Sequence, residues 1–287
     1  MINLFLNEKS LDGQFSSIEE FCDKGIVGLI AVLEDGKRLS DQTTLYKSAA
    51  LTDAKVTPDV TYTSVVFDES NRIYDGIRRY KVALLSLIDD PFWDSNSKQK
   101  SWDKYETLDG NSLNGTSIAE ADSRNGILVS FTHPSYSVTH IKIKKNGEEV
   151  EVSNTCQEGQ LIDVTYQKAF IKFKEYVELK FSGEKLDFAH ATMAKVWDII
   201  PPELEDAVYG AFETFCKRSW VEIPQDKGLG YKPYNKTRHN SRFFSSEEWD
   251  KGIKEFRISG KSRCFGYAEG GRFYILLMDL GHILGNL

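Results

Sequence analysis

Alternation of apolar and polar residues predicts several β-strands in this chain. The clearest case is 141–152, where two alternating runs flank Asn146-Gly147, the dipeptide preferred in a type I′ hairpin turn. Near the C-terminus, a second antiparallel hairpin is predicted from residues 263–267 and 272–279, on either side of Glu269-Gly270-Gly271. Two further strands are predicted at 62–67 and 127–131.

Apolar residues three and four positions apart predict helices between these strands. Ser70 is placed to cap a helix that buries Ile73, Ile77, Tyr80 and Leu84 and ends at Pro91. Further helices are predicted from Ser17 (weakened at Gly25 and Gly28), over Thr116–Arg124, after Pro201-Pro202, and from Ser245 through Trp249, Ile253 and Phe256. Residues 163–181 fit both a helix and a strand, and we expect a helix early and a strand late.

These elements predict an α+β fold with two parts of opposite charge. Residues 217–287 hold 13 Lys and Arg and 8 Asp and Glu, a net charge of +5, while the preceding residues carry −12, giving −7 for the chain. We therefore expect an acidic domain at 1–200, with antiparallel hairpins, and a small basic domain at 201–287 that ends in a hairpin. A continuous core across this boundary is the alternative.

Several classes of protein are disfavoured by what the sequence lacks. No apolar run approaches the ~20 residues that cross a bilayer, and no signal peptide is recognisable, so we expect a cytoplasmic protein without membrane contact. The four cysteines are far apart and predict neither a zinc site nor a disulfide framework. Nucleotide-binding glycine motifs are absent, and we expect no cofactor and no bound metal.

A basic segment within the C-terminal part is the main candidate for a binding surface. Its cations alternate with the aromatic residues Tyr231, Tyr234, Phe243 and Phe244. Cations offset phosphate charge and aromatic rings stack on unpaired bases, which favours nucleic-acid binding. The alternative is a solvated loop whose aromatic residues pack into the core. The predicted nucleic-acid-binding residues are Lys232, Lys236, Arg238, Arg242 and Lys261.

A metal-dependent nuclease is a further alternative. Glu175, Glu178 and Lys180 contain a Glu-x-Lys element on the strand expected there, which is loosely like the end of a restriction-type nuclease motif. Asp163 is one of several candidates for the upstream aspartate that such a motif requires. A charged alternating strand produces the same pattern by chance.

The C-terminal hairpin resembles that of RelE/ParE-type bacterial toxins. The similarity rests on Lys261–Tyr267, a Gly-Gly turn, Phe273–Leu276 and His282, preceded by a helix at 247–256, and covers about the last 70 residues. Some 200 residues precede it, which small toxins lack. Residues 7–15 and 117–121 resemble parts of an uncharacterised bacterial family.

The toxin resemblance implies RNA cleavage without a metal, by in-line attack of a 2′-hydroxyl on its phosphate. Arg263 and Lys261 would then stabilise the phosphate, and His239, His282 or Tyr267 would transfer protons. The leading hypothesis is a toxin-like ribonuclease effector in bacterial stress or phage defence, with RNA and a neutralising or regulatory protein as partners. The alternatives are a non-catalytic subunit that binds nucleic acid or protein, and the metal-dependent nuclease.

Overall fold

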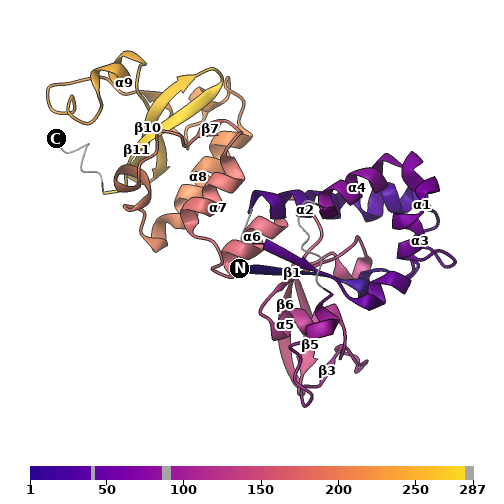
Figure 1. Ribbon diagram of the computed structural model, residues 1–287. Helices are drawn as coiled ribbons and strands as arrows, with labels where there is room; N and C mark the ends of the chain where they lie inside the picture. The colour runs from indigo at the N-terminus through magenta and orange to yellow at the C-terminus, as the bar shows by residue number, and fades with distance from the viewer. Residues whose placement is uncertain (40–42, 86–91, 282–287) are drawn as a thin grey trace. The chain divides into compact units, whose positions relative to one another are not determined.

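The computed structural model describes residues 1–39, 43–85 and 92–281, which belong to two compact units (Figure 1). Unit 1 spans Met1–Ile171 and unit 2 begins at Lys172, so the division comes earlier in the chain than the predicted boundary after residue 200. The reason is a helix at 173–181, whose Phe181 packs against Phe212 in the same core as the rest of unit 2. Both units combine helices with a sheet, which confirms the α+β class.

The sheet of unit 1 has the strand order β2-β1-β4-β6-β5-β3. Its strands are β1 (Ile2–Leu6), β2 (Thr43–Tyr46), β3 (Tyr105–Glu106), β4 (Ile127–Val129), β5 (His140–Lys145) and β6 (Glu148–Thr155). Neighbours from β2 to β6 are parallel, and β5 and β3 add an antiparallel edge. Because these four strands run in the same direction, their carboxyl ends lie at one edge of the sheet.

Two of the strand predictions for unit 1 are confirmed. The hairpin at 141–152 is β5 and β6, and its Asn146 and Gly147 have φ angles of 54° and 87°, as a type I′ turn requires. The strand predicted at 127–131 is β4. The strand predicted at 62–67 is wrong, because these residues form a helix.

The helices of unit 1 are α1 (Ile18–Glu20), α2 (Val27–Arg38), α3 (Tyr62–Phe67), α4 (Asp75–Leu85), α5 (Ser117–Ser123) and α6 (Gln160–Gln167). In α3, the Thr61 side chain accepts a hydrogen bond from the Ser64 backbone N–H, and this cap starts the helix. Tyr62, Val65 and Val66 are then buried together at helical spacing, so burial outweighs the strand preference of the valines.

The helix predicted from Ser17 is present but divided. A π-helical turn at Phe21–Gly25 separates α1 from α2. Gly28 then lets α2 approach the end of β6, since a Cβ at this position would lie 2.2 Å from the carbonyl oxygen of Cys156.

Of the other two helices predicted for unit 1, one starts later than expected and one matches closely. The one expected from Ser70 begins at Asp75 as α4, after a short 3₁₀ turn at Glu69–Ile73 that leaves Ile73 exposed. Pro91, expected to end it, lies outside the described residues. The helix predicted at 116–124 is α5, with Thr116 as its cap.

Unit 2 contains a five-stranded sheet with the order β7-β11-β10-β9-β8. Its strands are β7 (Leu186–Asp187), β8 (Lys232–Pro233), β9 (Lys254–Ser259), β10 (Ser262–Glu269) and β11 (Arg272–Asp279), and its helices are α7 (Phe173–Phe181), α8 (Glu205–Lys217) and α9 (Ser246–Asp250). The predicted C-terminal hairpin is confirmed as β10 and β11, and the helix predicted after Pro201-Pro202 as α8.

Two predictions for unit 2 are corrected. The strand expected late in 163–181 is α7, which buries Phe173, Tyr176, Val177 and Phe181 at helical spacing. The helix expected to run through Phe256 ends at Asp250, because Gly252 takes a left-handed φ of 76° and the chain continues as β9.

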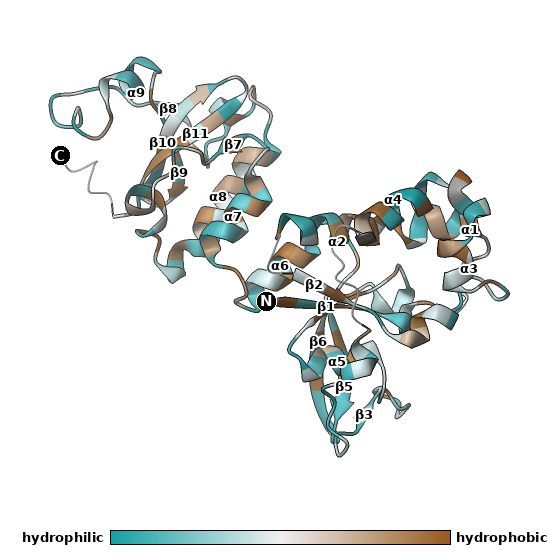
Figure 2. Cartoon of the chain, viewed as in Figure 1, coloured by the Kyte–Doolittle hydropathy of each residue, from teal (hydrophilic) through white to brown (hydrophobic). Residues whose placement is uncertain are grey.

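The two faces of the unit 2 sheet are covered differently. On one face, the ring centroid of Phe215 in α8 lies 4.8 Å from that of Phe256 and 5.4 Å from that of Phe273. On the other face, Phe265 and Leu276 pack against α9 and the loop that precedes it. Figure 2 shows that α9 is itself hydrophilic, and its buried residue, Trp249, packs it against the sheet. Within the described part of the chain, no helix is long and apolar enough to span a membrane.

A buried carboxylate in α5 provides a test of the unit 1 core. Glu120 is 0% exposed and accepts hydrogen bonds from Arg124 Nε (2.6 Å), the Lys98 backbone N–H (2.8 Å) and Ser97 Oγ (2.6 Å). Substitution of Glu120 by Ala leaves these donors unpaired and should lower the free energy of unfolding by about 3–5 kcal/mol in urea denaturation. As a control, Glu34→Ala removes an exposed pair with Arg79 and should cost less than about 1 kcal/mol. Equal losses for the two variants would contradict this account of the core.

Candidate functional site

Residues 232–242 of unit 2, here called the basic loop, comprise the short strand β8 and most of the connection from it to α9. The chain has no Asp or Glu between Asp226 and Glu247, so no acidic residue within this stretch offsets the loop's charge. Lys236, Arg238 and Arg242 are all exposed. The loop therefore presents a concentration of positive charge to solvent.

Hydrogen bonds hold the basic loop in one conformation. The Oδ1 of Asn240 accepts from the Thr237 backbone N–H at 2.6 Å, and its Nδ2 donates to the carbonyl oxygen of Asn235 at 3.0 Å. Trp249 in α9 donates its indole N–H to the Ser241 carbonyl at 3.1 Å. Because Asn240 is buried, these bonds are shielded from water, and the loop is braced from within.

Aromatic side chains anchor the basic loop to the sheet. Tyr234 stacks on Trp249 (centroids 6.0 Å apart, 18° between planes) and contacts the edge of Phe265 at 4.7 Å. Phe244 meets Trp249 edge-to-face at 5.1 Å. Of the two interpretations of the interleaved aromatic residues, packing into the core is therefore confirmed for Tyr234 and Phe244. Phe244 is buried and Tyr234 half-buried, and both rings are occupied by these contacts within the fold.

The cations of the loop differ in their surroundings. Lys232 pairs with Glu255 of β9 at 3.3 Å, so its charge is partly neutralised. Lys236 lies over the ring of Trp249 at 5.9 Å and Arg242 over Phe243 at 5.3 Å, contacts that orient both side chains and keep their charge. Among the residues that the structure describes, Arg238 has no acidic partner. Three predicted binding residues thus remain available to an anion.

Beside the loop lies a second group of side chains, here called the Tyr–Lys–His cluster: Tyr267, Tyr274, Lys251 and His190. Tyr267 and Tyr274 are directly opposed on β10 and β11 and stack with centroids 4.9 Å apart. The Lys251 ammonium donates to the Tyr267 hydroxyl at 3.2 Å and lies 4.5 Å from the centre of its ring. His190, exposed after β7, meets Tyr274 edge-on at 5.8 Å. Trp249, two residues before Lys251, joins this cluster to the basic loop.

The hydrogen bond with Tyr267 raises the pKa of Lys251 above its ordinary value, and nearby carboxylates, Glu269 first, add to this effect. Lys251 therefore keeps its positive charge throughout the neutral range. Tyr267 itself is buried, at 2% exposure, so the groups that the cluster offers to a ligand are the Lys251 ammonium, the His190 imidazole and the half-buried ring of Tyr274. A cation and an imidazole together can bind a phosphate and move a proton.

Of the other predicted catalytic residues, Arg263 lies apart from this cluster. Arg263 lies four residues from Tyr267 along β10, a separation of roughly 13 Å. Its guanidinium donates to the carbonyl oxygens of Gly260 (3.0 Å) and Ser262 (2.9 Å), and Lys261 is exposed at the same turn. His239 is exposed on the basic loop. His282 lies outside the described residues.

The carboxylates predicted for a metal-dependent nuclease are dispersed. Glu175, Glu178 and Lys180 lie on the helix α7, and Asp163 belongs to the other unit. Burial raises the pKa of Glu178, although Lys174 lies 3.9 Å from its carboxylate and acts in the opposite direction. Across residues 1–39, 43–85 and 92–281, no three His, Cys, Asp or Glu side chains converge as a metal site would need.

Two groupings of polar residues in space could not be found from the sequence. His190 and Lys251 come together with Tyr267 only through the fold, since they lie far apart in the chain. In unit 1, the segments 7–15 and 117–121, singled out by their resemblance to a bacterial family, meet at the carboxyl ends of the parallel strands. There the buried Glu8 accepts a hydrogen bond from the Ser117 backbone N–H at 3.0 Å.

Comparison of the chain with models of protein families, with curated proteins and with solved structures finds no match. The resemblance of β10 and β11 to RelE/ParE-type toxins therefore stays a prediction.

The anchoring of the basic loop predicts unequal effects of substitutions within it. Phe244→Ala removes a side chain that is 5% exposed and should lower the free energy of unfolding of unit 2 by about 3–5 kcal/mol. Arg238→Ala, on the exposed side, should change it by less than about 0.5 kcal/mol. Urea denaturation followed by tryptophan fluorescence measures both. A Phe244→Ala protein of unchanged stability would mean that the loop is not held by this packing.

Proposed function

We propose that this protein binds nucleic acid through the basic loop and the adjoining Tyr–Lys–His cluster of unit 2. The observation that carries the proposal is the exposure of Lys236, Arg238 and Arg242 on a loop that is braced by hydrogen bonds and aromatic packing. A preordered cationic surface loses little conformational entropy when it meets a phosphate backbone.

The distribution of charge along the chain favours unit 2 as the part that meets a polyanion. Residues 217–287 carry +5, while the preceding residues carry −12, so long-range electrostatic attraction favours the basic region. Tyr274, half-buried, and His190, exposed, stand next to the loop and offer ring faces or edges to an unpaired base. This combination favours single-stranded RNA or DNA over a duplex.

Substitution of Lys236, Arg238 and Arg242 together by Ala should weaken binding to a single-stranded oligonucleotide and flatten its salt dependence. Each phosphate contact on a single strand contributes about 0.7 to the slope of log K against log salt, so losing three should lower the slope by about 2. Fluorescence anisotropy across a salt series measures both the affinity and the slope.

A matched control removes three lysines from the helices on the opposite face of the unit 2 sheet. The triple variant Lys174→Ala, Lys180→Ala and Lys217→Ala has the same net charge as the loop variant but leaves the loop intact. This control variant should keep the slope of log K against log salt that the unmodified protein shows. Equal weakening by both triple variants, or binding that salt does not affect, would contradict the proposed surface.

Metal-free RNA cleavage is a second candidate, and the contact between Lys251 and Tyr267 specifically favours it. In such a reaction the 2′-oxygen bonds to the adjacent phosphorus, the bond from phosphorus to the 5′-oxygen breaks, and a 2′,3′-cyclic phosphate and a 5′-hydroxyl result. His190 can take the 2′-hydroxyl proton or supply a proton to the leaving oxygen, and Lys251 can stabilise the negative charge on phosphate. Tyr267 positions Lys251 through their hydrogen bond.

If this second candidate holds, RNA cleavage should persist in EDTA and yield 2′,3′-cyclic ends. His190→Ala should lower the cleavage rate by about 10²-fold or more, as loss of a general acid or base does. His140→Ala, at an exposed position at the start of β5 in unit 1, serves as the control and should change the rate little. Cleavage lost in EDTA, or kept in His190→Ala, would rule out this mechanism. Binding of RNA with no cleavage at all would leave the binding function alone.

A further inference from the structure

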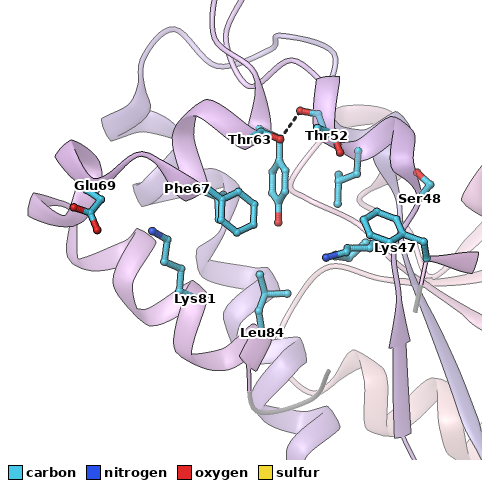
Figure 3. Close-up of a pocket in the computed structure, with 13 residues that line it drawn as sticks. Lys47, Ser48, Thr52, Thr63, Phe67, Glu69, Lys81 and Leu84 are labelled. Atoms are coloured by element: carbon cyan, nitrogen blue, oxygen red, sulfur yellow. Dashed lines mark hydrogen bonds between the residues drawn. The ribbon is translucent and has the colours of Figure 1, made fainter. Parts of the chain in front are cut away.

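A pocket of about 580 Å³ opens in unit 1 at the carboxyl ends of β1 and β2 (Figure 3). Leu6, the last residue of β1, and Lys47 and Ser48, which follow β2, form one side, while residues of α3 and α4 form the other. β1 and β2 are parallel neighbours, so their carboxyl ends lie side by side at this edge of the sheet. Ligands of open sheets with parallel strands bind beyond the carboxyl ends of the strands.

Aromatic rings line the pocket and its rim. Tyr62 is fixed from behind by a hydrogen bond between its hydroxyl and that of Tyr80 at 3.0 Å, and its ring faces the pocket. Phe67 and Phe92 also line it, yet they are 62% and 40% exposed. Large apolar rings at the mouth of a concave site gain free energy when a flat apolar molecule covers them.

Two lysines bring positive charge to the same pocket. Lys47 extends from the end of β2 with its ammonium 4.6 Å from the centre of the Phe92 ring, and Lys81 extends from α4. Figure 3 shows the two ammonium groups on opposite sides of the pocket, with the carboxylate of Glu69 beyond Lys81 at the outer edge. Both lysines are half-buried, which strengthens their attraction for an anion relative to that of fully solvated side chains.

One buried part of the pocket wall, at Ser48, is polar and held by hydrogen bonds. Ser48 is almost fully buried and donates to Glu8 at 3.4 Å, and the other carboxylate oxygen of Glu8 accepts from the Ser117 backbone N–H. Glu8 is thereby occupied by groups of the protein, so it orders the wall without placing an unpaired carboxylate in the pocket. A preformed wall lowers the entropic cost of binding.

We infer that this pocket binds a small aromatic anion, a flat ring system that carries a phosphate, sulfonate or carboxylate group. The ring would lie among Tyr62, Phe67 and Phe92, and the anionic group would be held by Lys81, while Lys47 on the opposite side adds to the positive potential of the pocket. The volume fits a ligand of this size, since small-molecule sites range from about 300 to 1,000 Å³. This inference concerns unit 1 and does not rest on the proposed function of unit 2.

Binding of 8-anilinonaphthalene-1-sulfonate to the full chain tests the inference, with the neutral N-phenyl-1-naphthylamine as a matched probe that lacks the anionic group. We expect one sulfonate site, with a Kd on the order of 10 µM, and binding of the neutral probe at least about tenfold weaker. Lys81→Gln should weaken the sulfonate by about tenfold or more, because a hydrogen bond to a charged group is lost. As a control, Lys142→Gln removes an exposed ion pair with Glu149 on the β5–β6 hairpin and should not change the affinity for the sulfonate.

A second variant tests the position of the site independently of charge. Thr63 lines the pocket and donates to the Thr52 carbonyl at 2.8 Å, so Thr63→Trp fills the space at the loss of one exposed hydrogen bond. It should abolish sulfonate binding while the far-UV circular dichroism stays unchanged. If this variant fails to fold, Lys81→Gln and the neutral probe still test whether the pocket binds an aromatic anion.

Competition then identifies the source of the ligand. Displacement of the sulfonate by mononucleotides, or by 1-naphthoate but not mononucleotides, supports the inference and distinguishes a nucleotide from another aromatic acid. Displacement by neither, equal binding of the neutral probe, or full binding in both Lys81→Gln and Thr63→Trp would overturn it.

Discussion

The contacts of Trp249 determine how unit 2 presents its charge. Its indole N–H binds the Ser241 carbonyl, its ring stacks on Tyr234 and meets Phe244, and Lys236 lies over it. One side chain thus ties the basic loop, α9 and the sheet together. Without this packing, a run of cations between Asp226 and Glu247 would be a solvated loop of many conformations. With it, the same charges form a surface of defined shape, which is what selective binding of a polyanion requires.

Unit 1 uses buried polar groups in a comparable way at the edge where its parallel strands end. Asn7 donates to Ser130, Ser130 donates to Asn154, and Glu8 joins α5 to the end of β2. Because these groups are buried, each must be hydrogen-bonded, and their mutual bonds fix the loops that follow the strands. The pocket forms beside this network. A rigid edge next to exposed rings and half-buried lysines is the arrangement from which a ligand site can be inferred.

Local signals in the sequence predicted the elements whose structure is decided locally. The turn residues Asn146-Gly147 specified the hairpin of β5 and β6, and Thr116 specified the start of α5. Where two periodicities fitted, as in 173–181, tertiary burial decided for the helix, and no local signal could have shown it. The same applies to the site. Charge counting located the basic loop, but His190 reaches Tyr274 only because β7 pairs with β11, a long-range contact that spacing does not reveal.

Photocrosslinking tests the proposed surface most directly, because it reports contact and not only affinity. The full chain would be irradiated with a single-stranded RNA that contains 4-thiouridine, and crosslinked peptides would be identified by mass spectrometry. We expect the crosslinks to fall within residues 232–251 and at Tyr274 and His190. Crosslinks concentrated on α7 and α8, or in unit 1, would contradict the account of how this protein meets nucleic acid.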